Sequence, residues 1–83
     1  MSSPVGKTLS ANIMYDNVDG SFEALLNIGQ TKCLYTCRIY ESKKIPTKYD
    51  DVKNLYSSLL NKYVTFVCDE FDENHILLVK LVN

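Results

Sequence analysis

Lys32–Tyr40 reads Lys-Cys-Leu-Tyr-Thr-Cys-Arg-Ile-Tyr, and its side chains alternate strictly in character. Such alternation is typical of a β-strand with one face on a core, because successive side chains of a strand point to opposite faces. One face carries Cys33, Tyr35, Cys37 and Ile39, and the other carries Leu34, Thr36, Arg38 and Tyr40. We expect the first face to line the core of the domain.

Two further strands are predicted upstream of this stretch. Residues 8–15 and 21–28 alternate in the same way, and Asp, Asn and Gly residues in 16–20 favour a turn between them. Gly29-Gln30 supplies a two-residue hairpin turn into the third strand. Residues 1–7 show no periodicity, so we expect them to form a flexible arm.

One helix is predicted downstream, after a loop over 41–46. Thr47 and Asp50 have the spacing of a capping box at the start of a helix. In such a box the side chain of the first residue accepts from the backbone N–H of the second, and the side chain of the second accepts from the backbone N–H of the first. Apolar residues then recur at helical spacing, at Val52, Leu55, Tyr56 and Leu59. We expect the helix to end near Asn61.

The last two predicted strands, 63–69 and 75–82, flank an acidic turn. Their inward residues are expected to be Val64, Phe66, Cys68, Leu77, Val79 and Leu81. A meander of three strands, a helix and a closing hairpin is the order of the five-stranded OB barrel. The sequence therefore predicts a mainly β fold with one helix, in the order β-β-β-α-β-β, as a single domain over 8–83.

Composition places the chain among small globular domains. It has 83 residues, 46% of them hydrophobic, and a formal net charge of −1. That is enough apolar surface for one small core, and it lacks the strongly basic balance that drives most nucleic-acid binding. Abundant Asn, Lys, Tyr and Ile are typical of an AT-rich genome such as that of a large DNA virus.

The cysteine count and the N-terminus indicate an intracellular protein, in the cytoplasm, the nucleus or a virion. Three cysteines and no Asn-x-Ser/Thr acceptor suit a reducing compartment. The first residues lack the apolar core of a secretory signal, and no window is long and apolar enough for a membrane span. We therefore expect neither secretion nor membrane insertion.

Cys37-Arg38-Ile39 resembles the arginine strand of the staphylococcal nuclease-like (thermonuclease) family. Residues 18–20 look like that family's Asp-Gly-Asp turn, and 72–77 look like its last turn and strand. The resemblance covers about residues 8–82. It implies an OB barrel, and for active members a calcium ion held by aspartates, with a carboxylate and two arginines acting on the phosphodiester.

The chain departs from that family at the residues that carry the chemistry. Ser21 stands at the second aspartate of the turn, and residues 42–47 replace the Asp-Thr-Pro-Glu segment with a cationic one. The second arginine, expected beside His75, is missing. Because Arg38 alone remains, we expect a catalytically inactive pseudoenzyme without metal or cofactor.

Two sets of residues are predicted to contact partners. The first is a basic and aromatic cluster on the third strand and the following loop: Arg38, Tyr40, Lys43, Lys44, Lys48 and Tyr49. The second is the outward side of the last strand: Ile76, Leu78 and Val82. An alternative for Arg38 is an ion pair with Asp19 or Glu23.

Three functions stay open on these residues. The favoured one is an interaction or adaptor module that binds a protein partner or a second copy of itself. The alternatives are a single-stranded nucleic-acid-binding protein and a degenerate metal-dependent nuclease. A zinc site made of Cys33, Cys37, Cys68 and His75 is disfavoured, because Cys33 and Cys37 would lie about 13 Å apart along one strand. We expect these cysteines to be core residues.

Overall fold

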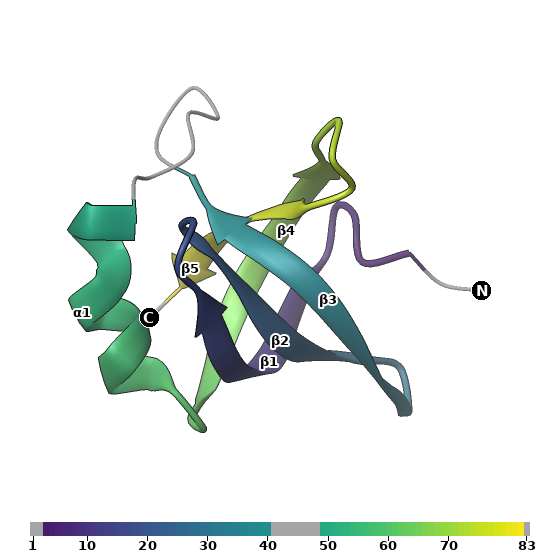
Figure 1. Cartoon of the computed structure of the whole chain (residues 1–83). Coiled ribbons are helices and arrows are strands. Elements are labelled where there is room, and N and C mark those ends of the chain that lie inside the picture. The colour runs from purple at the N-terminus through teal and green to yellow at the C-terminus, as the bar shows by residue number, and fades with distance from the viewer. Residues whose placement is uncertain (1–2, 41–48, 83) are drawn as a thin grey trace.

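The computed structural model describes residues 3–40 and 49–82 (Figure 1). The described elements are β1 (Thr8–Asn17), β2 (Ser21–Ile28), β3 (Thr31–Ile39), α1 (Tyr49–Leu59), β4 (Tyr63–Phe71) and β5 (Leu77–Val82). The strands close a barrel in the order β1-β2-β3-β5-β4. The predicted OB-like barrel, with its single helix and its β-β-β-α-β-β order, is confirmed. The expected loop over 41–46 and the expected cap at Thr47 lie outside the described residues.

The first three strands form an antiparallel meander whose turns match the sequence. Gly20 and Gly29 both adopt positive φ, at 99° and 63°, a conformation that costs glycine little because it has no Cβ. The two-residue turn at Gly29 sets the β2–β3 register, with Ile28 opposite Thr31 and Ser21 opposite Arg38. Turn composition therefore fixes which outward side chains of β2 and β3 become neighbours.

Two short pairings close the barrel. β1 pairs antiparallel with β4 from Thr8 to Asn12, whereas β3 pairs parallel with β5 over only Cys37–Ile39. The register shifts between Ile13 and Tyr15 in β1 and between Cys68 and Glu70 in β4. Such bulges bend and twist a strand, which a barrel this small requires.

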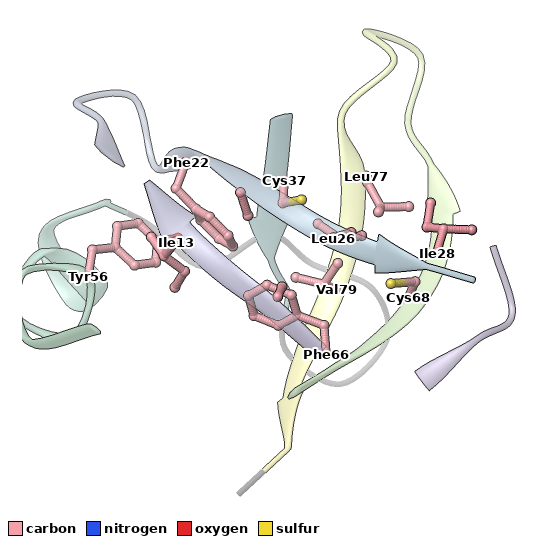
Figure 2. Close-up of a cluster of buried hydrophobic side chains, with 12 residues drawn as sticks. Ile13, Phe22, Leu26, Ile28, Cys37, Tyr56, Phe66, Cys68, Leu77 and Val79 are labelled. Carbon is pink, nitrogen blue, oxygen red and sulfur yellow. The ribbon is translucent and has the colours of Figure 1, made fainter. Parts of the chain in front are cut away.

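Three aromatic rings contact one another in the core, and Tyr56 reaches the other two from the side of α1 (Figure 2). The Phe22 ring lies 5.0 Å from Tyr56 and 5.5 Å from Phe66, between centroids and in tilted geometry. Of the predicted inward residues, Cys37, Phe66, Cys68, Leu77 and Val79 are buried, and Cys33, Tyr35, Ile39, Val64 and Leu81 pack partly buried against them. The predicted core faces are therefore confirmed.

Helix α1 meets the barrel through Tyr56. Its side chain is fully buried, but Leu55, predicted on the same buried face, is 37% exposed. That prediction was wrong because the helix rests on one end of the barrel, so only a narrow stripe of its surface is covered (Figure 1). Asn61, at φ 64°, ends the helix in a left-handed residue and donates its N–H to the Ile13 carbonyl at 2.8 Å.

The β4–β5 turn differs from the sequence prediction. β4 continues to Phe71, and β5 begins at Leu77 instead of residue 75. Asp72 Oδ1 accepts hydrogen bonds from the N–H groups of Asn74 at 2.8 Å and Ile76 at 2.9 Å. This Asx-type turn places His75 at φ 63°, which is incompatible with an extended strand.

Residues 3–7, part of the expected flexible arm, lie along β4. The Gly6 N–H donates to the Cys68 carbonyl at 2.9 Å, and the Cys68 N–H donates to the Lys7 carbonyl at 2.8 Å. Pro4 is buried. These bonds lengthen the contact between the N-terminal segment and β4 beyond the start of β1.

In the described part of the chain, no helix is long and apolar enough to cross a membrane.

Replacing Tyr56 with Phe should destabilise the fold. The Tyr56 hydroxyl donates to the Gly20 carbonyl at 2.8 Å, and both residues are buried. Loss of that donor leaves a buried carbonyl unsatisfied, which costs about 1 to 3 kcal/mol in the free energy of unfolding. Urea denaturation measures the change. Tyr63→Phe is the control, because Tyr63 is 65% exposed and should show a change near zero. Equal effects of the two variants would contradict the assigned role of this hydrogen bond.

Candidate functional site

The outer face of β1, β2 and β3 carries the candidate site, and it has two ends. One end lies beside the β1–β2 turn and is polar. The other lies toward the β2–β3 turn and is a shallow groove. Each is built from outward residues that the strand register brings side by side.

Arg38 and Asp19 form an ion pair at the polar end. Arg38 Nη2 lies 3.7 Å from Asp19 Oδ2, and Asp19 Oδ1 accepts bonds from the Ser21 N–H at 3.0 Å and the Ser21 hydroxyl at 2.6 Å. The pKa of Asp19 is lowered, chiefly by the hydrogen bond from the Ser21 hydroxyl and next by the bond from the Ser21 N–H. Burial opposes this shift, and the positive charge of Arg38 adds to it. Of the two partners predicted for Arg38, Asp19 is therefore the one that the structure pairs with it.

Glu23 is held by neutral donors on the same face. Asn17 Nδ2 donates to Glu23 Oε2 at 2.6 Å, and Thr36 Oγ1 lies 2.9 Å from each carboxylate oxygen. Thr36 faces Glu23 directly across the β2–β3 ladder. Both carboxylates of this end thus accept bonds from adjacent side chains. Within the described residues, the buried Arg38 Nε has no hydrogen-bond partner.

The predicted basic and aromatic cluster is only partly described. The Arg38 side chain is 22% exposed, and the Tyr40 ring lies 5.9 Å from Lys80 Nζ. Lys43, Lys44 and Lys48 lie outside the described residues, as does the side chain of Tyr49 at the start of α1. The cluster as a whole therefore stays a prediction.

The predicted interface on the last strand needs a correction at Leu78. Val82 is 40% exposed and Ile76 is partly buried, but Leu78 is only 6% exposed. Leu78 pairs with Arg38 of β3 on one side and Glu70 of β4 on the other. β5 pairs with a strand on each edge at this position, and the Leu78 side chain is buried. Leu78 is therefore not available as a contact residue.

The groove at the other end has a volume of about 190 Å³. Seven residues line it, namely Asn12, Met14, Leu25, Asn27, Lys32, Asn61 and Tyr63. Tyr63 forms an exposed wall, and Lys32 Nζ lies 6.0 Å from its ring centroid. Asn27 Nδ2 donates to Ser10 Oγ at 2.8 Å, whereas Asn12 Oδ1 is buried and has no partner among the described residues.

Apolar surface extends from the groove onto β3. Leu25 on the groove floor faces Leu34 across the β2–β3 ladder, and Leu34 is 54% exposed. Sequence reasoning missed the groove. The outward positions of β2 and β3 could have suggested one side of it, but Asn61 and Tyr63 arrive only when the end of α1 folds back onto β1.

The cysteines do not form a metal site in the described part of the chain. No group of three or more His, Cys, Asp or Glu side chains there could hold one metal ion. Cys37 and Cys68 are buried in the core and Cys33 is partly buried. Burial raises the pKa of the Cys68 thiol to about 11, and burial also raises the pKa of Cys37 strongly, with a smaller contribution from Cys68.

Alkylation should therefore distinguish Cys33 from the other two thiols. Only thiolates react, so a pKa near 11 leaves Cys68 about a hundredfold less ionised at pH 8 than a thiol with an ordinary pKa of 9. We expect iodoacetamide to label Cys33 first in the folded protein, and all three cysteines in denaturant. Tandem mass spectrometry gives the order, because fragmentation is needed to separate Cys33 from Cys37 within the shared tryptic peptide 33–38. Rapid labelling of Cys37 without denaturant would contradict the barrel core.

Asp19→Asn should change stability only above acidic pH. A carboxylate whose folded pKa is lowered contributes stability above its unfolded value of 3.8, and that contribution is lost as the pH falls through the folded pKa. Because Asp19 is 64% exposed, solvent screening limits the loss to about 0.5 to 1 kcal/mol at pH 7. Urea titrations at pH 7 and between pH 4 and 2 measure it. A difference that persists undiminished at pH 2 would exclude this ionisation as its cause.

Comparison of the chain with protein-family models, with curated proteins and with solved structures found no match. The candidate site is therefore characterised by its own geometry. The carboxylates of its polar end bond neighbouring side chains, and its groove combines amide, cationic and apolar groups.

Proposed function

We propose that the chain is a catalytically inactive, staphylococcal nuclease-like OB module that binds a protein segment in the groove of β1, β2 and β3. The exposed apolar surface of this face carries the proposal. Tyr63 is 65% exposed and lines the groove, and Leu34 is 54% exposed and faces the lining residue Leu25 across the β2–β3 ladder. Large apolar side chains gathered around a concave site favour a binding role, because their exposure to water is unfavourable until a partner covers them.

The polar end supports a binding role over a catalytic one. A nuclease needs carboxylates free to hold a metal ion and cations free to meet a phosphodiester. Here Asp19 bonds Ser21 and pairs with Arg38, while Glu23 bonds its own neighbours. These contacts tie strands β1, β2 and β3 together at the turn, so the charged groups contribute to structure.

The groove chemistry suits an extended peptide. Asn27 and Asn61 in the lining each carry both a donor and an acceptor, the same pair that a peptide group presents, so their amides can bond a main chain in either sense. A volume of about 190 Å³ is enough for one large apolar side chain. Among the described residues of the lining, Lys32 alone carries a charge, and it favours a carboxylate on the partner.

Single-stranded nucleic acid is the second candidate. An exposed Tyr63 ring with Lys32 above it could stack a base and meet one phosphate. One cation in the groove of a chain with net charge −1 gives little phosphate neutralisation, however. The peptide is therefore favoured.

Selection of displayed random peptides on the folded domain tests the proposal. We expect enriched peptides to combine an apolar residue with an acidic one, and to bind a Tyr63→Ser variant at least about tenfold more weakly, because loss of an aromatic anchor costs at least about 1.4 kcal/mol. The matched control is Val18→Ser, which removes a 78% exposed apolar side chain at the β1–β2 turn, outside the groove.

Two results would overturn the protein-binding proposal. One is a failure to enrich any peptide, and the other is enrichment of peptides that bind the Tyr63→Ser variant as well as the parent. Fluorescence anisotropy with a labelled oligothymidine is run in parallel over a salt series. Binding that weakens steeply with salt and is lost in Tyr63→Ser, with no peptide enriched, would assign the groove to nucleic acid instead.

A further inference from the structure

The first half of β3 has an open edge. β2 pairs with β3 along its length, from Thr31 to Arg38, but β5 pairs with β3 only from Cys37 onward. No described strand pairs with 31–35 on the side away from β2. Figure 1 shows this part of β3 running with β2 away from β5 toward the β2–β3 turn. A strand edge of this kind presents main-chain groups that can bind another strand.

The register identifies which main-chain groups face outward. In a two-residue hairpin the closing pair, here Ile28 and Thr31, bonds across the ladder, and bonding pairs then alternate along antiparallel strands. The unbroken register makes Cys33 and Tyr35 bond to β2, so Lys32 and Leu34 turn their N–H and C=O groups to the open side. Tyr40 has the same phase and donates its N–H to the Val79 carbonyl of β5 at 3.2 Å, as this alternation requires.

The open edge lacks the protection that exposed edges usually have. A lysine on an edge strand ordinarily discourages pairing. The Lys32 side chain instead crosses the outer face toward β4, where its Nζ lies over the Tyr63 ring. Leu34, the other outward residue of this segment, is apolar and 54% exposed. No proline is present from Thr31 to Tyr35.

We propose that two copies of this chain pair antiparallel through this edge, with Cys33 at the two-fold axis. In that register Lys32 of one copy bonds Leu34 of the other, so two copies satisfy all four outward groups of each edge. Thr31 then faces Tyr35 of the second copy. The free segment ends where β5 begins on one side and at Gly29 on the other. A second copy offers a strand of the same length, bounded by the same turn.

The geometry at the axis gives the proposal a direct readout. Cys33 occupies a non-hydrogen-bonded position on the open side, where facing residues of antiparallel strands have Cα atoms about 4.5 Å apart. That spacing lies within the range for a disulfide. Cys37 and Cys68 are buried in the core, so only Cys33 is placed for a cross-link between copies.

Mild oxidation of the full chain tests the arrangement. At concentrations up to about 1 mM, which a small interface requires, we expect a covalent dimer on a non-reducing gel, with Cys33 mapped to Cys33 by mass spectrometry. Cys33→Ser should abolish the cross-link while sedimentation still shows a dimer that dissociates on dilution. A monomer at every concentration, or a cross-link through another cysteine, would overturn the proposal.

A matched pair of variants tests the main-chain bonds. Leu34→Pro removes the N–H that points to the open edge and leaves the bonds to β2 intact, so the dimer should be lost. Leu34→Ala keeps that N–H and should retain it. In case the proline variant fails to fold, hydrogen exchange on the parent chain gives the same answer. Protection of the Lys32 and Leu34 amides should rise with protein concentration, while Cys33 and Tyr35 are protected throughout, and concentration-independent exchange at Leu34 would overturn the pairing.

The edge is made of main-chain groups and the groove of side chains, so different variants test the two proposals, although Lys32 contributes to both surfaces and Leu34 adjoins the groove. Tyr63→Ser should weaken peptide binding and leave the Cys33 cross-link unchanged. Leu34→Pro should remove the dimer, and any peptide contact at Tyr63 should persist.

Discussion

The parallel pairing of β3 with β5 is the constraint on which the rest of this structure depends. It spans only Cys37–Ile39, yet it turns a five-stranded sheet into a closed barrel. Closure buries Cys37 and Leu77 against the three-ring core. Leu78 is buried beside this pairing, between Arg38 of β3 and Glu70 of β4. The seam stops at Cys37, so the first half of β3 keeps one open edge.

Helix α1 closes one end of the barrel through Tyr56. Tyr56 places its ring against Phe22 and its hydroxyl on the Gly20 carbonyl, so one side chain closes an end of the barrel and anchors the β1–β2 turn. Burial raises the pKa of Tyr56 to about 12, so the phenol stays protonated and remains a donor at physiological pH. The same turn carries Asp19, whose bonds to Ser21 and ion pair with Arg38 hold the polar end of the outer face.

The two ends of the outer face of β1, β2 and β3 differ in the hydrogen bonds that their side chains make with one another. Near the β1–β2 turn, register places donors opposite carboxylates, and the charged groups bond one another. Toward the β2–β3 turn the same ladder pairs Leu25 with Leu34 and Asn27 with Lys32, and the last two side chains contact Ser10 and Tyr63 instead of each other. Their surface therefore remains open to a partner. Two surfaces result, a groove on the face and an edge beside it, and they differ in the groups that they offer.

Local sequence signals were sufficient to predict the strands, the helix and their order. Alternation along 32–40, the glycine turns and the helical spacing through Tyr56 are local signals, and local backbone preferences suffice to read them. The sequence also indicated the pairing of Arg38 with an acid of the first turn or second strand. The ends of the strands were predicted less accurately. The last strand was expected to start at residue 75, but the hydrogen bonds that the Asp72 side chain accepts form a turn, and β5 starts at Leu77.

Only the tertiary structure decided which outward residues stay exposed. In a continuous apolar run such as 76–79, sequence cannot tell which face is covered, because coverage at Leu78 comes from β3 and β4. The groove likewise needs Asn61 and Tyr63 beside Asn12, a contact made by folding the end of α1 back onto β1. The open edge of β3 depends on where a parallel partner stops. Each is a long-range contact, and such contacts depend on how the whole chain packs, so no local pattern records them.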